Sequence, residues 1–260
     1  MRSPERLPYS FADLMAAKGS SFYGLLRDTA PDALPRPDGV VDAPHGTTIL
    51  ALHFRDGVVM AGDRRATSGN LIAQRNLRKL EPADSHSCVA FAGTVGHGLD
   101  LVRLFQLELR HYEKIEGVEL SFPAKVNRLS AMVRGNLDKA LQGMAAVPLF
   151  AGWDEAEERG RIFTFDIAGA PAEEDDFGGT GSGWHFAKGS LKKLHRRDLT
   201  RDEAVGAALR ALFDAADDDA ATGGPDLGRR IYPTVAVVTA EGYDEVAEEE
   251  LAGLASRLAP

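Results

Sequence analysis

The sequence predicts an α+β fold in which two mainly antiparallel β-sheets pack face to face, with a layer of helices on each outer side. Two observations lead to this prediction. Strand-like segments occur in groups that are followed by pairs of helical segments, and the long helical segments carry apolar stripes that must pack on something apolar. A doubly wound parallel sheet would alternate strands and helices singly. We therefore expect one domain over residues 47–260, built as a four-layer αββα sandwich.

A group of strands opens the domain. The tight turn Arg55-Asp56-Gly57 separates two apolar runs, which predicts a hairpin. The predicted strands of this group span residues 47–54, 58–63, 71–73 and 86–92. Two helices come next, over about residues 96–114 and 123–142. Their apolar residues recur every three or four positions, and Pro123 suits a first helical turn.

The second half of the chain repeats this order. Its predicted elements are strands over 145–152 and 161–167, helices over 184–196 and 201–218, a strand over 234–239, and an acidic helix over 244–258. We interpret the glycine-rich segment 178–183 as punctuation between elements. This segment lacks both the Lys-Ser/Thr of a P-loop and the spacing of a dinucleotide fingerprint, so we expect no nucleotide and no cofactor.

Residues 1–46 differ in character from the remainder of the chain. They hold one short amphipathic piece, residues 11–26, and then a stretch rich in proline and aspartate up to Gly46. This composition gives the segment no core of its own. It is typical of an arm or a removable segment, and composition alone favours a plain flexible tail.

Composition excludes several classes of function. A net charge of −9 with scattered basic pairs argues against a nucleic-acid surface. The single cysteine, Cys88, excludes an internal disulfide framework. The seven histidines show no short ligand spacing, so we expect no metal site. Neither a secretory signal nor a membrane span is evident, which predicts a cytoplasmic protein with no membrane partner.

The chemistry is predicted at the junction of Gly46 and Thr47. A threonine that opens a strand directly after a glycine is where chain cleavage would create an N-terminal nucleophile. Thr47 would then hold a hydroxyl and a free α-amine, so that one residue carries nucleophile and base. Asp63 ends an apolar strand, and Lys79 could supply the charge that it needs. Read singly, Asp63 could be a turn former and Lys79 an ordinary solvated lysine.

A family resemblance brings these residues together. Over residues 47–260 the chain closely resembles the β subunits of 20S proteasomes, in particular the actinobacterial type. The segments that carry the resemblance are Thr47-Thr-Ile-Leu-Ala-Leu, Gly57-Val-Val-Met-Ala-Gly-Asp-Arg-Arg-Ala-Thr67, Arg78-Lys79, Phe91-Ala-Gly-Thr94, Gly181-Ser-Gly183 and Tyr232-Pro-Thr234. The resemblance implies the N-terminal-nucleophile hydrolase fold, with residues 1–46 as a propeptide that is removed by autocatalytic cleavage.

The resemblance also implies roles for individual residues. Thr47 matches the nucleophile of this family of threonine endopeptidases, Asp63 and Lys79 match the residues that orient and tune it, and Gly93 matches the oxyanion-hole residue. The supporting hydrogen-bond group matches Ser182, Asp219 and Thr222, where Thr222 stands in place of a serine. The primary specificity pocket matches Ala66, Thr67, Leu77, Glu81, Phe91 and Val95. This set predicts a preference for apolar residues, although Glu81 could admit a basic one.

The implied partners are proteasome α subunits, other β subunits in seven-membered rings, a ring-shaped ATPase that acts through the α ring, and unfolded or tagged polypeptide substrates. Two other functions stay open. The chain could be a self-processing amidohydrolase that acts on small amides, which the matches at Asp63, Lys79, Gly93 and Ser182 disfavour. It could also be a non-catalytic ring subunit, although such subunits usually lose the nucleophile or its lysine.

Overall fold

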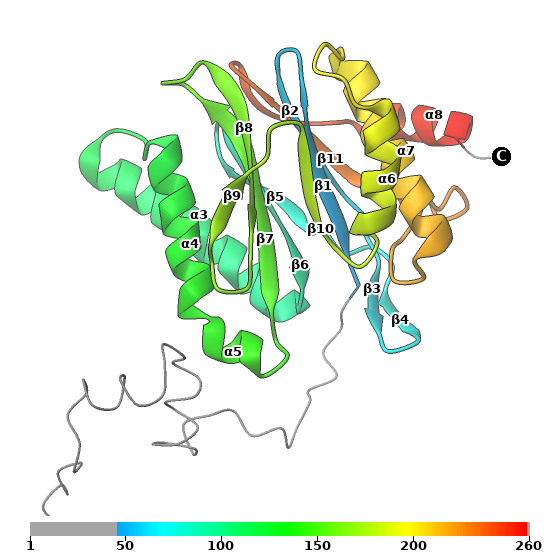
Figure 1. Cartoon of the computed structure of the whole chain (residues 1–260), viewed down its shortest axis with the longest axis horizontal. Coiled ribbons are helices and arrows are strands. Elements are labelled where there is room, and N and C mark those ends of the chain that lie inside the picture. Colours follow the sequence, from blue (N-terminus) through cyan, green and yellow to red (C-terminus); the bar gives the residue numbers. More distant parts are fainter. Residues whose placement is uncertain (1–45, 259–260) are drawn as a thin grey trace, which may run out of the picture. The chain divides into compact units, whose positions relative to one another are not determined.

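The computed structural model describes residues 46–258. Within that range, two five-stranded antiparallel sheets are flanked by helices (Figure 1). The first sheet has the order β10 (Phe177–Gly181), β1 (Thr48–Phe54), β2 (Gly57–Gly62), β11 (Thr234–Thr239) and β12 (Gly242–Glu245). The second has the order β5 (Leu80–Asp84), β6 (Ser87–Gly93), β7 (Ala146–Asp154), β8 (Arg159–Phe165) and β9 (Pro171–Glu173). The predicted propeptide, apart from Gly46, lies outside the described residues.

Helices cover the outer face of each sheet. The helices on the first sheet are α6 (Trp184–Leu194), α7 (Arg201–Asp218) and α8 (Glu248–Leu258), and those beside the second are α3 (Val95–Glu116), α4 (Phe122–Gly135) and the short α5 (Leu137–Leu141). A two-stranded ribbon of β3 (Ala66–Ser68) and β4 (Leu71–Gln74) stands apart from both sheets. The predicted four-layer α+β architecture is confirmed.

The apolar side chains fall into three layers that follow the two-residue period of the strands. Ile49 and Ala51 of β1 point into the core between the sheets, where Cys88 and Ala90 of β6 meet them. Leu50 and the alternate residues of the first sheet pack against α6 and α7. The alternate residues of β6 pack in the same way against α3 and α4. Because both faces of each sheet are covered, the inner strands are apolar throughout.

Several elements differ from the prediction. Most of the glycine-rich segment belongs to β10, an edge strand that pairs with β1. Several of its residues are glycines because close neighbours leave no room for side chains. A Cβ at Gly179 would lie 2.5 Å from the ring of Trp184. The predicted helix over 123–142 is interrupted after Gly135, where the Asn136 side chain donates to Met132 O. The strands β3, β5, β9 and β12 were not predicted, and the terminal helix begins at Glu248 because residues 242–245 pair with β11.

The antiparallel registers gather several strand ends at one end of the sandwich. The start of β1 lies beside the ends of both neighbours, because Thr48 pairs with Gly181 of β10 and Ile49 pairs with Gly62 of β2. Asp63 therefore comes after β2 at the same edge where Thr47 precedes β1. Among residues 46–258, none of the helices has the length and apolar character needed to cross a membrane.

Candidate active site

Thr47 lies directly before β1 and is almost completely buried, with 2% of its surface exposed. Its hydroxyl oxygen lies 2.6 Å from the carbonyl oxygen of Gly46, to which it donates a hydrogen bond. Gly46 has a φ of +122°, and a Cβ on it would collide with the hydroxyl of Thr67 and press on Ala221. Only glycine fits this position without strain.

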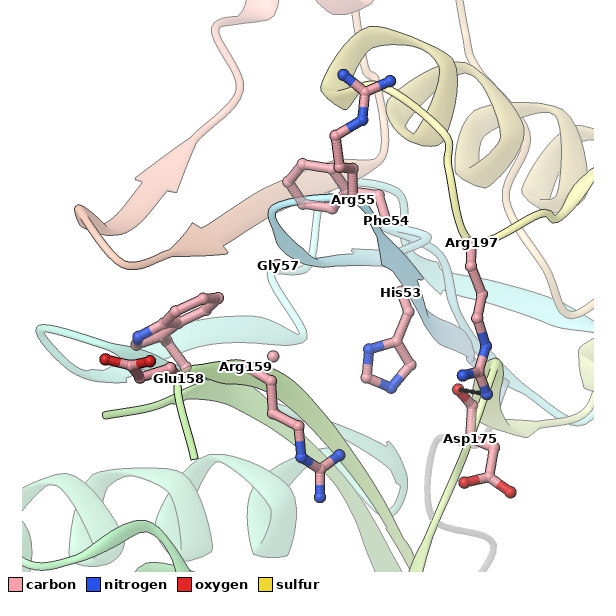
Figure 2. A pocket seen from close by; sticks show the side chains of 10 residues that line it. His53, Phe54, Arg55, Gly57, Glu158, Arg159, Asp175 and Arg197 are labelled. Carbon is pink, nitrogen blue, oxygen red and sulfur yellow. Dashed lines mark hydrogen bonds between the residues drawn. The ribbon is translucent and has the colours of Figure 1, made fainter. Parts of the chain in front are cut away.

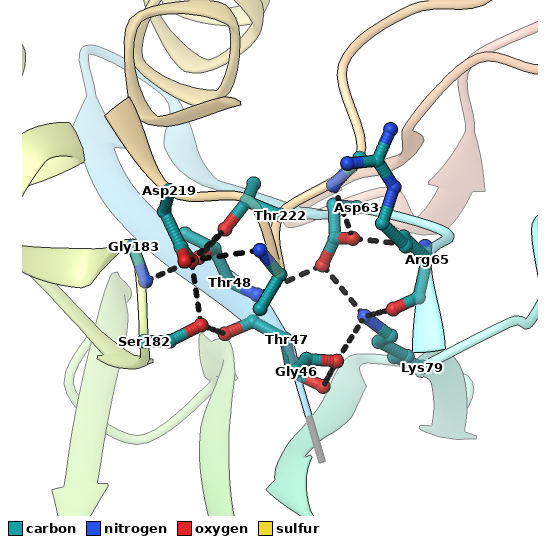
Figure 3. Close-up of polar contacts among 12 residues, drawn as sticks. Gly46, Thr47, Thr48, Asp63, Arg65, Lys79, Ser182, Gly183, Asp219 and Thr222 are labelled. Carbon is teal, nitrogen blue, oxygen red and sulfur yellow. Dashed lines mark hydrogen bonds and ion pairs between the residues drawn. The ribbon is translucent and has the colours of Figure 1, made fainter. Parts of the chain in front are cut away.

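Asp63 and Lys79 form a buried ion pair beside this peptide bond (Figure 3). Lys79 Nζ lies 2.7 Å from Asp63 Oδ1, and neither side chain is exposed to solvent. The ammonium also donates to the carbonyl oxygens of Gly46, at 3.0 Å, and of Arg65. Burial lowers the pKa of Lys79 despite the charge of Asp63. Its N–H groups are all directed at named acceptors, so the amine has one fixed orientation.

Asp63 is held in place by backbone N–H groups as well as by Lys79. Thr48 N donates to Oδ1 at 2.8 Å, and the N atoms of Arg65 and Gly223 each donate to Oδ2 at 2.9 Å. These donors compensate for the water that a buried carboxylate gives up. The predicted association of Thr47, Asp63 and Lys79 is present in the structure.

A second carboxylate, Asp219, directly follows α7 and lies on the other side of Thr47. Its Oδ2 accepts hydrogen bonds from Ser182 Oγ and Thr222 Oγ1, both at 2.6 Å, and its Oδ1 accepts from Ala221 N. Partial burial alone would raise the pKa of Asp219, but these hydrogen bonds together hold its pKa below the ordinary value. The three residues predicted as a supporting group do lie together.

This second group also contacts the backbone of the predicted nucleophile. Ser182 N donates to Thr47 O at 2.9 Å, and Ser182 Oγ lies 3.5 Å from the same oxygen. Thr48 Oγ1 lies 2.6 Å from Thr222 Oγ1. The sequence-based reasoning missed Thr48, because the second threonine of Gly-Thr-Thr was interpreted only as part of a strand. It also missed the backbone donors of Arg65 and Gly223, which no side-chain pattern reveals.

The residues predicted as a substrate pocket are distributed around the same end of the fold. Glu81 on β5 is paired with Arg78, whose Nε lies 3.2 Å from Glu81 Oε1 and whose two terminal nitrogens bind Glu245. Phe91 is completely buried and its ring lies against Gly98 of α3, so it presents no accessible wall to a ligand. The other predicted pocket residues are Ala66 and Thr67 of β3, Leu77, and Val95, the first residue of α3.

Gly93 ends β6 with a φ of +110°. A Cβ at this position would collide with the carbonyl of Ala145, so glycine is required here on steric grounds. The adjacent N–H of Thr94 donates to the same carbonyl at 2.7 Å. The role of the Gly93 N–H toward a developing negative charge stays a prediction.

A separate cavity of about 310 Å³ lies near the turn between β1 and β2 (Figure 2). It is lined by charged side chains that include Arg55, Arg159, Asp175 and Arg197 around the ring of His53. Arg159 and Arg197 are paired with acidic neighbours, and burial together with nearby cations lowers the pKa of His53. The residues lining this cavity include no serine, threonine or cysteine, so it offers no hydroxyl or thiol nucleophile beside a base. Among residues 46–258, no group of three or more His, Cys, Asp or Glu side chains is arranged to hold a metal ion.

Comparison with known proteins places these observations in a family. The sequence model of the proteasome subunit family matches residues 43–226. The chain belongs to the proteasome subunit family. A protein of Frankia casuarinae named proteasome subunit beta is 56% identical over 251 residues, which cover 95% of this chain and 90% of that protein. The proteasome subunit beta of Streptomyces griseus is 50% identical over 260 residues, covering 98% and 92%. The proteasome subunit beta 2 of Thermomonospora curvata is 54% identical over 249 residues, covering 94% and 89%.

Membership of the proteasome subunit family establishes the general function of the chain. The chain is a β-type subunit of the 20S proteasome core, an assembly that degrades proteins, and it associates with other proteasome subunits. Of the motifs that suggested this family from the sequence alone, all but Tyr232-Pro-Thr234 lie within the matched range. The roles of individual residues rest on the geometry described above.

Proposed function

We propose that this chain is a catalytic threonine endopeptidase subunit that matures by cutting its own backbone between Gly46 and Thr47. One observation carries the proposal. The hydroxyl of Thr47 donates a hydrogen bond to the carbonyl oxygen of the preceding peptide at 2.6 Å. The Lys79 ammonium donates to that same oxygen at 3.0 Å. Nucleophile, target carbonyl and a buried cation are thus in contact within one chain.

This contact leads directly to self-cleavage. Thr47 Oγ attacks the carbonyl carbon of Gly46, and Lys79 stabilises the negative charge that develops on the oxygen. The C–N bond then breaks, the hydroxyl proton moves to the departing nitrogen of Thr47, and an ester joins Gly46 to Thr47 Oγ. Water hydrolyses this ester. The products are a carboxylate on Gly46 and a Thr47 that has its hydroxyl and a free α-amine.

The mature site repeats the same chemistry on substrates. The free amine of Thr47 accepts the hydroxyl proton while Oγ attacks a peptide carbonyl, and it returns the proton to the leaving amine. The ammonium of Lys79 disfavours a second positive charge beside it, which keeps the Thr47 amine competent as a base. Asp63 holds Lys79, the N–H of Gly93 faces the developing oxyanion, and Ser182, Asp219 and Thr222 orient the amine.

We further propose the setting in which this chemistry takes place. Seven β subunits form a ring that stacks on a ring of α subunits, and a ring-shaped ATPase delivers unfolded or tagged polypeptides through the α ring. Enclosure within a chamber protects other cytoplasmic proteins from an enzyme with broad specificity. The apolar pocket residues Leu77 and Val95, and the pairing of Glu81 with Arg78, support cleavage after apolar rather than basic residues.

The test is the covalent state of the assembled particle. The chain is co-produced with its α partner, and intact mass and N-terminal sequence are measured for the wild type and for Thr47→Ala. We expect wild-type β chains that begin at Thr47, and variant chains that retain residue 46 and cleave no fluorogenic peptide. Wild-type particles that keep residues 1–46 and still digest polypeptides would contradict the proposal.

A further inference from the structure

Thr48, the residue after the predicted nucleophile, has a side chain that the mechanism above does not use. It is completely buried at the start of β1. Its hydroxyl oxygen lies 2.6 Å from the hydroxyl oxygen of Thr222 and 2.9 Å from the backbone N of Gly183 (Figure 3). A buried hydroxyl with two polar neighbours at these distances is part of a hydrogen-bond network.

The chemistry of the partners fixes the direction of every hydrogen bond in this network. Gly183 N–H can only donate, so Thr48 Oγ1 accepts from it. At the other end, Asp219 is ionised and can only accept, so the protons of Thr222 and Ser182 both point at its Oδ2. Thr48 must then donate its own proton to Thr222 Oγ1. This series of hydrogen bonds runs from Gly183 N–H through Thr48 and Thr222 to Asp219, and the donor of each bond is determined.

This direction determines what the hydroxyls of Thr222 and Ser182 can offer to a third group. Their protons are committed to Asp219, so each oxygen can only accept another hydrogen bond. A neutral amine has two N–H groups and one lone pair. If the N–H groups of a freed Thr47 amine bind the oxygens of Ser182 and Thr222, the lone pair is left as the acceptor for the hydroxyl proton. Successive donors also polarise one another, which strengthens the bond from Thr222 to Asp219.

We propose that Thr48 is a positioning residue for peptide hydrolysis at Thr47, acting through Thr222 by donating the hydrogen bond that fixes the orientation of its hydroxyl. This inference rests on the proposed function, because it concerns the same amine and the same nucleophile. Thr48 does not touch the substrate, since its side chain has no exposed surface. Its loss should therefore lower kcat and leave KM unchanged.

The test compares Thr48→Val, which keeps the shape but removes the hydroxyl, with Thr48→Ser, which keeps the hydroxyl. The matched control is Thr234→Val on β11 of the same sheet, because Thr234 is buried and its hydroxyl has no partner among the described residues. We expect kcat per processed site to fall about three- to tenfold in Thr48→Val, the worth of one hydrogen bond. Thr48→Ser should restore most of kcat, and Thr234→Val should not change it.

A double-mutant cycle separates action through Thr222 from a general effect on folding. If Thr48 acts through Thr222, adding Thr48→Val to Thr222→Val should lower kcat by less than about twofold further. A further fall as large as in the wild-type background would refute the inference, and so would an unchanged kcat in Thr48→Val. If Thr48→Val prevents assembly, Thr48→Ser against Thr48→Ala makes the same comparison between two smaller side chains.

Failure of this inference can be told from failure of the proposed function. The Thr47→Ala variant is measured in the same series. Peptidase activity that survives Thr47→Ala would remove the proposed function itself. An inactive Thr47→Ala together with a fully active Thr48→Val would remove only the role of Thr48.

Discussion

Replacing Lys79 by methionine tests how much the fold and the chemistry depend on the buried ion pair. The substitution keeps the length of the side chain but removes its charge and its donors. Asp63 would keep the three backbone N–H donors of Thr48, Arg65 and Gly223 and lose only its cation. Breaking a buried pair typically costs about 3–5 kcal/mol. Because those donors remain, we expect the lower end of that range, about 3 kcal/mol.

The measurement uses the unassembled precursor in a Thr47→Ala background, so that every sample has the same covalent chain. Urea unfolding of Thr47→Ala is compared with that of Thr47→Ala/Lys79→Met, and the midpoints are converted with a common m-value. In the otherwise native chain, Lys79→Met should also slow self-cleavage by about 10²–10³-fold, the usual effect of removing one donor to a developing oxyanion. A free energy of unfolding changed by less than about 1 kcal/mol, with normal processing, would refute this reasoning.

Three further predictions concern other parts of the structure. The pKa of Asp219 in the folded protein lies below its ordinary value of 3.8. The stability that ionised Asp219 contributes is therefore present above pH 3.8 and is lost as the pH falls through the folded pKa. Asp219→Asn should flatten this acid dependence in circular dichroism titrations. Gly98→Ala would drive a Cβ into the ring of Phe91 and should cost about 1–3 kcal/mol in urea unfolding, whereas the control Gly206→Ala in α7 meets open space and should be neutral or stabilising by up to about 1 kcal/mol. Gly46→Ala combines a positive φ with collisions, so it should slow the appearance of processed chains, monitored by intact mass, at least about tenfold; processing at the wild-type rate would contradict the steric argument.

The layered fold could be predicted from the sequence because its signals are local. The apolar runs of β1, β2, β6 and β11 and the stripes of the long helices recur at fixed periods. The missed strands are short or carry few apolar residues, and their pairing depends on partners far away in the chain. The strand β10 is the clearest case, since its glycines are selected by the backbone of β1 and the ring of Trp184. Strand propensity alone would reject such a segment.

The residues of the candidate site also divide into those that the sequence reveals and those that it does not. Charged and hydroxyl side chains such as Asp63, Lys79 and Ser182 stand out in the sequence, and the family resemblance assigns them together. Backbone donors do not, because every residue except proline has the same N–H group. The N–H groups of Arg65 and Gly223 that hold Asp63 depend on where two loops pass. Phe91 shows that the family resemblance can also mislead. The resemblance matched Phe91 to the substrate pocket, but the alternation of side chains along β6 turns Phe91 toward α3.

The hydrogen bonds around the Gly46–Thr47 peptide are distributed unequally along the chain. This distribution bears on how Thr47 could first cleave its own chain and then act on substrates. On the C-terminal side, Ser182 N binds Thr47 O, Asp63 binds Thr48 N, and the pairing of β1 begins directly afterwards. On the N-terminal side, Gly46 O is held by Lys79 and by the Thr47 hydroxyl itself. The proposed cleavage would therefore release the carbonyl end and leave the contacts that fix Thr47 intact. The geometry that directs Thr47 at its own chain is then already the geometry that a substrate carbonyl would meet.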